Sequence, residues 1–133
     1  MNGLHLIADL HDCRCAPNFL LDAVGLERFC VDACRRHGVT VVGQLFHTFL
    51  DPQGNPAGVT GTVVLAESHL AVHTWPEIGS VTLDVYVCNF SADNSHRAHT
   101  LFEEVVAAFA PTRLEKQEVI RGQLNQIETV TRL

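Results

Sequence analysis

Apolar and polar residues alternate along much of the chain, and this alternation predicts the strands. A period of two is the signature of a strand with one buried face. It predicts strands over residues 4–10, 39–49, 59–65 and 81–90, with residues 66–75 continuing the third of these. A loop is predicted over 51–58, which holds two prolines and two glycines, and a final edge strand over 114–124.

Two other segments have apolar residues at steps of three and four, which predicts amphipathic helices. The first helix is expected from Asn18 to Gly38, with Gly25 weakening it locally and Gly38 ending it. The second is expected to be capped by Asp93 or Asn94 and to run to about Phe109, where the following proline ends it.

The order of these elements predicts an α+β fold formed by a single domain over residues 1–133. Consecutive strands in the middle of the chain favour a mainly antiparallel sheet, and two helices on one face would complete a two-layer α/β sandwich. The strands carry few charges on either side. The second face of the sheet is therefore a candidate surface for forming a dimer.

Composition and charge restrict the class of protein further. The chain is 47% apolar and has a formal net charge of −6, which disfavours nucleic-acid binding because that function needs a basic patch. No window approaches the roughly 20 apolar residues of a membrane span, and residues 1–10 do not resemble a signal peptide. An odd number of cysteines, five, fits reduced thiols. We expect a cytoplasmic protein without membrane or nucleic-acid partners.

The segment from Gly58 to Glu77 holds the most unusual chemistry. An apolar strand is followed there by Glu67, Ser68 and His69, and burying such side chains without partners is costly. Ser68 and His73 are a possible nucleophile and base, but most serines near a histidine have no such role. In an unbroken strand their parity puts them on opposite faces, so cooperation requires the chain to bend or break between them.

Residues 66–77, which read AESHLAVHTWPE, resemble the signature of the small prokaryotic S-adenosylmethionine decarboxylases. The resemblance extends over roughly residues 3–122. It includes a cysteine at the family's spacing in Asp84–Cys88, and the pattern Phe46-His47-x-Phe49. In this family the chain breaks itself at the Glu-Ser bond. The resemblance therefore implies self-cleavage between Glu67 and Ser68, into a β chain of residues 1–67 and an α chain of residues 68–133.

The same resemblance implies a pyruvoyl cofactor made from Ser68, which forms a Schiff base with the substrate amine and acts as an electron sink. No metal is expected. The implied reaction is decarboxylation of S-adenosylmethionine to the aminopropyl donor for spermidine and polyamine synthesis. A homodimer of cleaved protomers is implied too, with the active site at its interface.

Residue roles follow from the resemblance position by position. His73 would be the proton acceptor during cleavage, since an imidazole can accept a proton near neutral pH. Cys88 would be the proton donor during decarboxylation, and its parity with Asp84 and Tyr86, away from the valines of that strand, favours a functional role. Thr60 stands where the family usually has serine, and it is a possible processing hydroxyl. Glu77 would bind the ribose hydroxyls and Phe49 would stack on adenine. On residue type alone, Cys88 and Phe49 would be core residues and Glu77 a solvated charge.

Three alternatives stay open. A pyruvoyl enzyme on this scaffold could decarboxylate arginine or ornithine, because residues 51–57 and 78–80 depart from the family near the expected pocket. A zinc module would use His69 with His73 or Cys13 with Cys15, but strand residues four apart lie about 13 Å apart, too far for one ion. A regulatory subunit without activity is the third alternative, which the intact Ser68, His73 and Cys88 disfavour.

Overall fold

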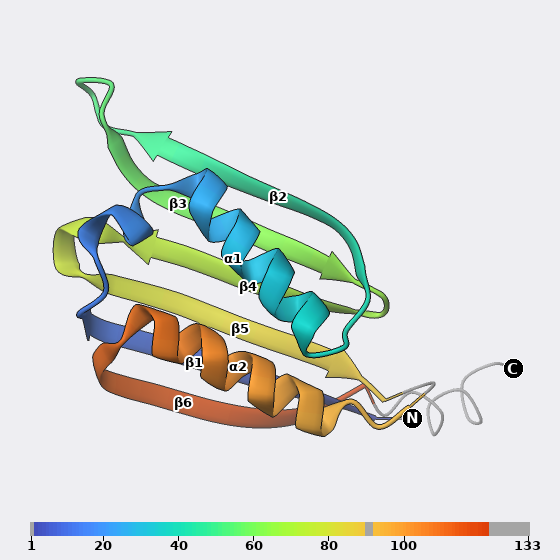
Figure 1. Ribbon diagram of the computed structural model, residues 1–133. Helices are drawn as coiled ribbons and strands as arrows, with labels where there is room; N and C mark the ends of the chain where they lie inside the picture. Colours follow the sequence, from blue (N-terminus) through green and yellow to red (C-terminus); the bar gives the residue numbers. More distant parts are fainter. Residues whose placement is uncertain (1, 90–91, 123–133) are drawn as a thin grey trace, which may run out of the picture.

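The computed structural model describes residues 2–89 and 92–122, and these form one layer of sheet under one layer of helices (Figure 1). Six strands are described: β1 Gly3–Cys13, β2 Val41–Leu50, β3 Pro56–Leu65, β4 Ser68–Trp75, β5 Ser80–Cys88 and β6 Pro111–Arg121. The helices are α1 Ala23–Arg36 and α2 Ser95–Phe109, with short 3₁₀ helices η1 Pro17–Leu20 and η2 Pro76–Ile78. The strand order is β2-β3-β4-β5-β1-β6, and every neighbouring pair is antiparallel. The predicted α+β sandwich is confirmed.

The core lies between the helices and one face of the sheet. Residues of α1 and α2 that recur at steps of three and four are buried, including Leu26, Cys30, Leu101 and Phe102. The sheet contributes the alternate residues of each central strand, as the burial of Leu6 and its same-parity neighbours along β1 shows. Burial of these apolar side chains, at about 25 cal/mol per Å², is the main stabilising contribution.

The first helix begins later than the sequence pattern predicted. Residues 17–20 form the 3₁₀ turn η1, and Asp22 caps α1 by accepting a hydrogen bond from the backbone N–H of Gly25 at 3.1 Å. A Cβ at Gly25 would lie 2.6 Å from Asp22 Oδ2. Gly25 therefore makes room for the cap, a role that the pattern of apolar residues did not indicate.

The predicted loop over 51–58 is shorter than expected. Strand β3 already begins at Pro56, because the carboxylate of Asp51 closes the turn by accepting from the backbone N–H groups of Gln53 and Asn55, both at 2.9 Å. The last strand begins at Pro111, which an edge strand tolerates. Phe90 and residues 123–124, which were placed in strands, lie outside the described residues.

The second face of the sheet carries no helix in the described part of the chain, and we call it the open face (Figure 1). Large apolar side chains on it are at least 38% exposed: Ile7, Leu45, Phe49, Val64, Trp75 and Val119. An apolar face of this extent is typical of a protein-binding surface. Separately, none of the described helices has the length and apolar character needed to cross a membrane.

Candidate active site

The bond between Glu67 and Ser68 lies in the tight turn that joins β3 to β4. Leu65 and Ser68 form the last pair of the hairpin, so Ala66 and Glu67 make the turn. Glu67 has a φ of 62°, in the left-handed region, which costs a residue with a side chain about 1–2 kcal/mol. The backbone N–H of Ala66 donates to the carbonyl of Thr40 at 2.9 Å. The peptide bond before Ser68 is thus exposed, anchored on one side and conformationally strained.

The hydroxyl of Ser68 accepts a hydrogen bond from the backbone N–H of Cys88 at 3.2 Å. By strand parity the side chain of Ser68 shares the helix-covered face with Leu70 and Val72, which are fully buried. A cavity of about 190 Å³ borders Ser68 and Glu67, with Arg97 of α2 among its lining residues. The structure therefore brings Ser68 and Cys88 together at one end of the sheet.

The side chain of Cys88 has the parity of Asp84 and Tyr86, away from the buried valines of β5, as the alternation predicted. Cys88 is only 7% exposed despite facing the open side at the end of β5. Its backbone carbonyl accepts from the Asn94 side chain at 3.0 Å, which ties the end of β5 to the residue before α2. These contacts fix the position of Cys88 next to Ser68.

Thr60 and His73 form a second cluster on the open face. They are directly paired across β3 and β4, and His73 Nδ1 lies 3.2 Å from Thr60 Oγ1 in a hydrogen bond. His47 of β2 pairs with Thr60 from the other side. Trp75 stacks obliquely near His73, with ring centroids 6.2 Å apart. This hydrogen bond places an imidazole and a hydroxyl side by side.

Ser68 and His73 are not brought together within one chain. Strand β4 runs unbroken from Ser68 to Trp75, so the two residues point to opposite faces. Five residues of strand also separate them by about 17 Å. The chain neither bends nor breaks between them, because the turn falls at Ala66–Glu67, before Ser68.

The two predicted substrate-binding residues lie at the His73 end of β4. Glu77 is exposed in η2, directly after β4, and it lines a cavity of about 530 Å³ together with Asp51 and several apolar residues. Phe49 is 50% exposed on the open face and its ring packs against His47 at 4.9 Å between centroids. Neither residue lies beside Ser68 of the same chain.

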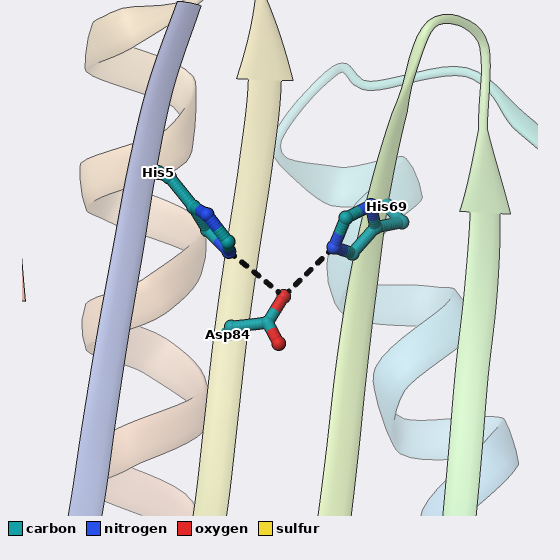
Figure 2. A group of neighbouring side chains, drawn as sticks. All are labelled: His5, His69 and Asp84. Carbon is teal, nitrogen blue, oxygen red and sulfur yellow. Dashed lines mark hydrogen bonds and ion pairs between the residues drawn. The ribbon is translucent and has the colours of Figure 1, made fainter. Parts of the chain in front are cut away.

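A group of three side chains that the sequence analysis missed lies between these clusters on the open face (Figure 2). His69 Nε2 hydrogen-bonds Asp84 Oδ1 at 2.8 Å, and His5 Nε2 lies 3.2 Å from the same oxygen without the alignment of a hydrogen bond. The three residues come from β4, β5 and β1. Parity alone could have placed each on the open face, but only strand order makes them neighbours.

This group meets the distance requirement of a metal site, since its three ligand atoms lie within 4.8 Å of one another. The hydrogen bonds around His5 oppose that use. Arg121, always a donor, donates to His5 Nδ1 at 3.1 Å, so the imidazole proton is on Nε2, the atom that faces Asp84. A metal would need the lone pair of Nε2 and a proton on Nδ1. The geometry fits a hydrogen-bonded network better than a metal centre.

Comparisons with known proteins agree with this arrangement. The sequence model of S-adenosylmethionine decarboxylase matches residues 4–122. The S-adenosylmethionine decarboxylase proenzyme of Methanococcus maripaludis is 35% identical over 121 residues, 90% of this chain and 89% of that one. The proenzyme of Thermosipho africanus is 36% identical over 126 residues, 94% of this chain and 88% of that one.

A solved structure supports the same assignment. The crystal structure of the adenosylmethionine decarboxylase from Aquifex aeolicus VF5 superposes with a TM-score of 0.76 at 29% identity, over 90% of each chain. The match to the family spans nearly all of the described sheet and both helices. The chain therefore belongs to the S-adenosylmethionine decarboxylase family.

Proposed function

We propose that this chain cuts itself between Glu67 and Ser68 and that the pyruvoyl group formed at residue 68 decarboxylates S-adenosylmethionine. The product is the aminopropyl donor of polyamine synthesis, including that of spermidine. Family membership supports the reaction and the substrate. The observation that carries the self-cleavage is the position of Ser68, with its hydroxyl held by Cys88 N–H directly after the strained turn residue Glu67.

The cleavage uses atoms of this chain and one water. The hydroxyl oxygen of Ser68 attacks the carbonyl carbon of Glu67, which exchanges the peptide bond for an ester and frees the amine of residue 68. Loss of the α-proton then expels the Glu67 carboxylate and leaves dehydroalanine. Its imine tautomer is hydrolysed, which releases ammonia and leaves the pyruvoyl group. Residues 1–67 become the β chain and 68–133 the α chain of a single domain.

The turn geometry favours this exchange. Left-handed backbone at Glu67 stores about 1–2 kcal/mol in the uncut chain, and this strain is released when the peptide bond breaks. The exposed turn also admits the water that the last step consumes. The residues present therefore fit the formation of a pyruvoyl group at position 68. Once formed, that group supplies the electron sink for decarboxylation.

The separation of the two clusters supports a homodimer with composite active sites. One chain provides Ser68 and Cys88 at one end of β4, and Thr60 with His73 about 17 Å away at the other. The apolar open face would bury its exposed side chains against a second copy, and packed sheets lie about 10 Å apart. In a two-fold dimer packed through this face, the partner subunit's His73 would act on the α-carbon of residue 68, which lies in the sheet itself although the Ser68 side chain points toward the helices, and the reverse.

The remaining residues take roles in that composite site. His73, oriented by Thr60, accepts the α-proton of residue 68 during cleavage. Cys88, next to residue 68, donates the proton that replaces the carboxylate on the substrate carbon. Glu77 binds the ribose hydroxyls and Phe49 stacks on adenine, both from the end of the sheet that carries His73.

The intact mass of freshly purified protein under denaturing conditions, beside Ser68→Ala, tests the cleavage. Two fragments meeting between residues 67 and 68, the second blocked to Edman degradation and lighter than encoded by one ammonia, are expected. A wild-type chain that stays uncut, as Ser68→Ala does, contradicts the proposal. It would favour the alternative of a regulatory subunit without activity.

Release of carbon dioxide from labelled S-adenosylmethionine, arginine and ornithine tests the substrate. Only S-adenosylmethionine is expected to react, because the relatives from Methanococcus maripaludis and Thermosipho africanus both carry the name of that decarboxylase. No described residue specifically favours the arginine or ornithine alternative. Release from either of those amino acids without release from S-adenosylmethionine would remove the roles of Glu77 and Phe49.

A further inference from the structure

We infer that the hydrogen bond between His69 and Asp84 is a clamp that positions the pyruvoyl group after cleavage, an inference that rests on the proposed function. We call His69 and Asp84 the clamp pair. They are positioning residues, because they act on residue 68 through the chain and not through contact with the substrate.

Cleavage creates the need for such a clamp. In the uncut chain, residue 68 is held from both sides by peptide bonds, and the turn before it is anchored by the bond from Ala66 N–H to the Thr40 carbonyl. After the cut, Ala66 and Glu67 belong to the other fragment. Residue 68 is then the end of a chain, and chain ends fray unless they are tied down. Its position depends on how firmly residue 69 is held.

His69 is the first residue after that end with a fixed side chain. Its backbone pairs with Val64 of β3 and with Tyr86 of β5, and its Nε2 donates to Asp84 Oδ1 at 2.8 Å. Hydrogen bonds to a charged group are the stronger kind. The imidazole therefore fixes residue 69 to β5, the strand that also carries Cys88. This contact holds the pyruvoyl carbonyl in a constant position relative to the proton donor.

Asp84 is in turn held from its other side (Figure 2). His5 Nε2 lies 3.2 Å from Asp84 Oδ1, and Arg121 fixes the His5 ring by donating to its Nδ1 at 3.1 Å. The Arg121 guanidinium also lies over the Tyr86 ring, 4.4 Å from its centroid. These contacts join β6, β1, β5 and β4 in a row and limit the orientations open to the carboxylate.

The clamp acts on one of the two reactions. Cleavage begins with residue 68 held by covalent bonds, so loss of the clamp pair leaves it nearly unchanged. Decarboxylation requires a free chain end to stay aligned with Cys88 and the substrate, and a displacement of 1 Å can lower such a rate by roughly 100-fold. A general loss of structure would instead slow both reactions together.

The test compares Asp84→Ala, Asp84→Asn and His69→Phe with wild type and with His11→Ala. The last is a matched control, because His11 is another histidine on the same face of β1 whose Nε2 lies near a carboxylate, that of Glu115, at 3.4 Å. Half-times of cleavage are measured by intact mass, and kcat and KM by release of carbon dioxide. Deuterium uptake of the first peptide of the α chain reports fraying in the cut protein directly.

We expect Asp84→Ala and His69→Phe each to lower kcat by roughly 10- to 100-fold, with cleavage half-times and KM within about twofold of wild type. Both variants take up deuterium faster at residues 69–72. The double variant, Asp84→Ala with His69→Phe, has a kcat no lower than that of either single variant. Asp84→Asn keeps an acceptor oxygen, so its kcat is expected between those of wild type and Asp84→Ala. His11→Ala matches wild type.

Two results would overturn the clamp while leaving the proposed function intact. One is a cut Asp84→Ala enzyme with wild-type kcat and deuterium uptake. The other is an equal loss of cleavage and decarboxylation rates in both clamp variants, which would make the pair part of general folding. A wild-type chain that is never cut overturns the proposed function and the clamp together.

Discussion

Replacement of Thr74 by valine removes the one buried polar side chain identified in the described core and is expected to destabilise the fold strongly. Thr74 is 6% exposed. Its hydroxyl accepts from the backbone N–H of Val59 and donates to the carbonyl of Leu20, both at 2.8 Å. One side chain thus joins β4 to β3 and to η1.

The magnitude follows from the two groups that lose their partner. Valine has nearly the shape of threonine, so the change leaves the N–H of Val59 and the carbonyl of Leu20 without that hydroxyl. A buried polar group without a partner costs about 1–3 kcal/mol. We expect Thr74→Val to lower the free energy of unfolding by about 2–4 kcal/mol, because η1 near the surface can admit some water to the Leu20 carbonyl.

Urea unfolding of the Ser68→Ala chain measures this, since that background keeps a single uncut species under the proposed self-cleavage. Trp75 is the single tryptophan of the chain and reports the transition by fluorescence. Thr74→Ser is the matched control: it keeps the hydroxyl, loses one methyl group and should cost about 1 kcal/mol. A Thr74→Val variant as stable as Thr74→Ser would refute the reasoning that the hydroxyl stabilises the hairpin.

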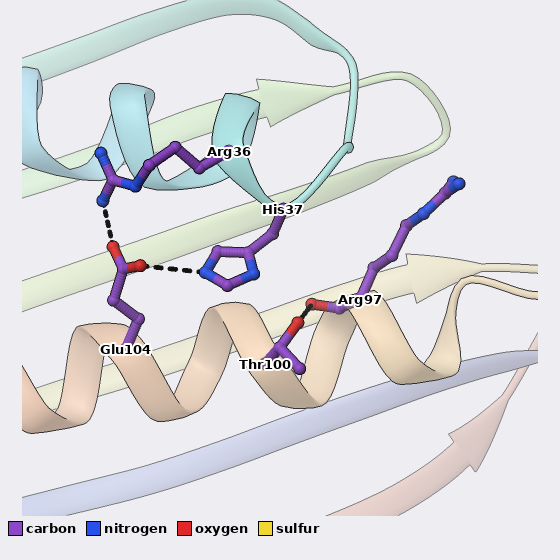
Figure 3. Close-up of polar contacts among 5 residues, drawn as sticks. All are labelled: Arg36, His37, Arg97, Thr100 and Glu104. Carbon is purple, nitrogen blue, oxygen red and sulfur yellow. Dashed lines mark hydrogen bonds and ion pairs between the residues drawn. The ribbon is translucent and has the colours of Figure 1, made fainter.

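Three further predictions concern packing, pH and thiol reactivity. A Cβ at Gly61 would lie 2.1 Å from the Phe46 ring, so Gly61→Ala should lower the free energy of unfolding by about 1–3 kcal/mol in urea melts. Burial would raise the pKa of Glu104, but hydrogen bonds and charges from the basic residues at the end of α1 outweigh it and lower that pKa (Figure 3). The stabilisation from the contacts of Glu104 is therefore present above its pKa in the unfolded chain and is lost as pH falls through its pKa in the folded chain. Glu104→Gln should make the free energy of unfolding depend less on pH below about pH 5. The pKa of Cys13 is raised to about 11, mainly by burial and less by the nearby Cys15 and Asp12. Alkylation of Cys13 at neutral pH should therefore be far slower in the native protein than in urea.

Each of these has an outcome that contradicts it. Gly61→Ala with wild-type stability would show that the Phe46 ring can move without cost. If the unfolding free energies of wild type and Glu104→Gln change with pH in parallel, the contacts of Glu104 with the end of α1 do not contribute to the loss of stability in acid. Equal alkylation rates of Cys13 in native and unfolded protein would show that its burial does not protect the thiol.

Local pattern in the sequence was sufficient to locate the elements, and the resemblance to a known family pointed to the bond between Glu67 and Ser68. The alternation of valines along β5 determined which side of that strand is buried, and Cys88 lies on the other side as predicted. Steps of three and four residues located both helices, because a helix must bury a single stripe. The proximity of Glu67 to Ser68 is covalent and needs no fold.

The ends of elements were harder, since they depend on single contacts. The start of α1 is set by a hydrogen bond from Gly25 to Asp22, and the length of the loop before β3 by the turn that Asp51 closes. Both contacts involve a carboxylate that could accept from several nearby backbone N–H groups, and the sequence does not indicate which. Only the folded geometry selects one.

Tertiary structure alone decided which side chains meet. Strand order places β1 between β5 and β6, and this brings His5, 79 positions away in the sequence, next to Asp84. The unbroken path of β4 separates Ser68 from His73, which only a second copy of the chain can bring together in our proposal. Strand pairing and register depend on the burial of a whole face, a property of many distant residues together, whereas a period of two or 3.6 is visible within a single segment.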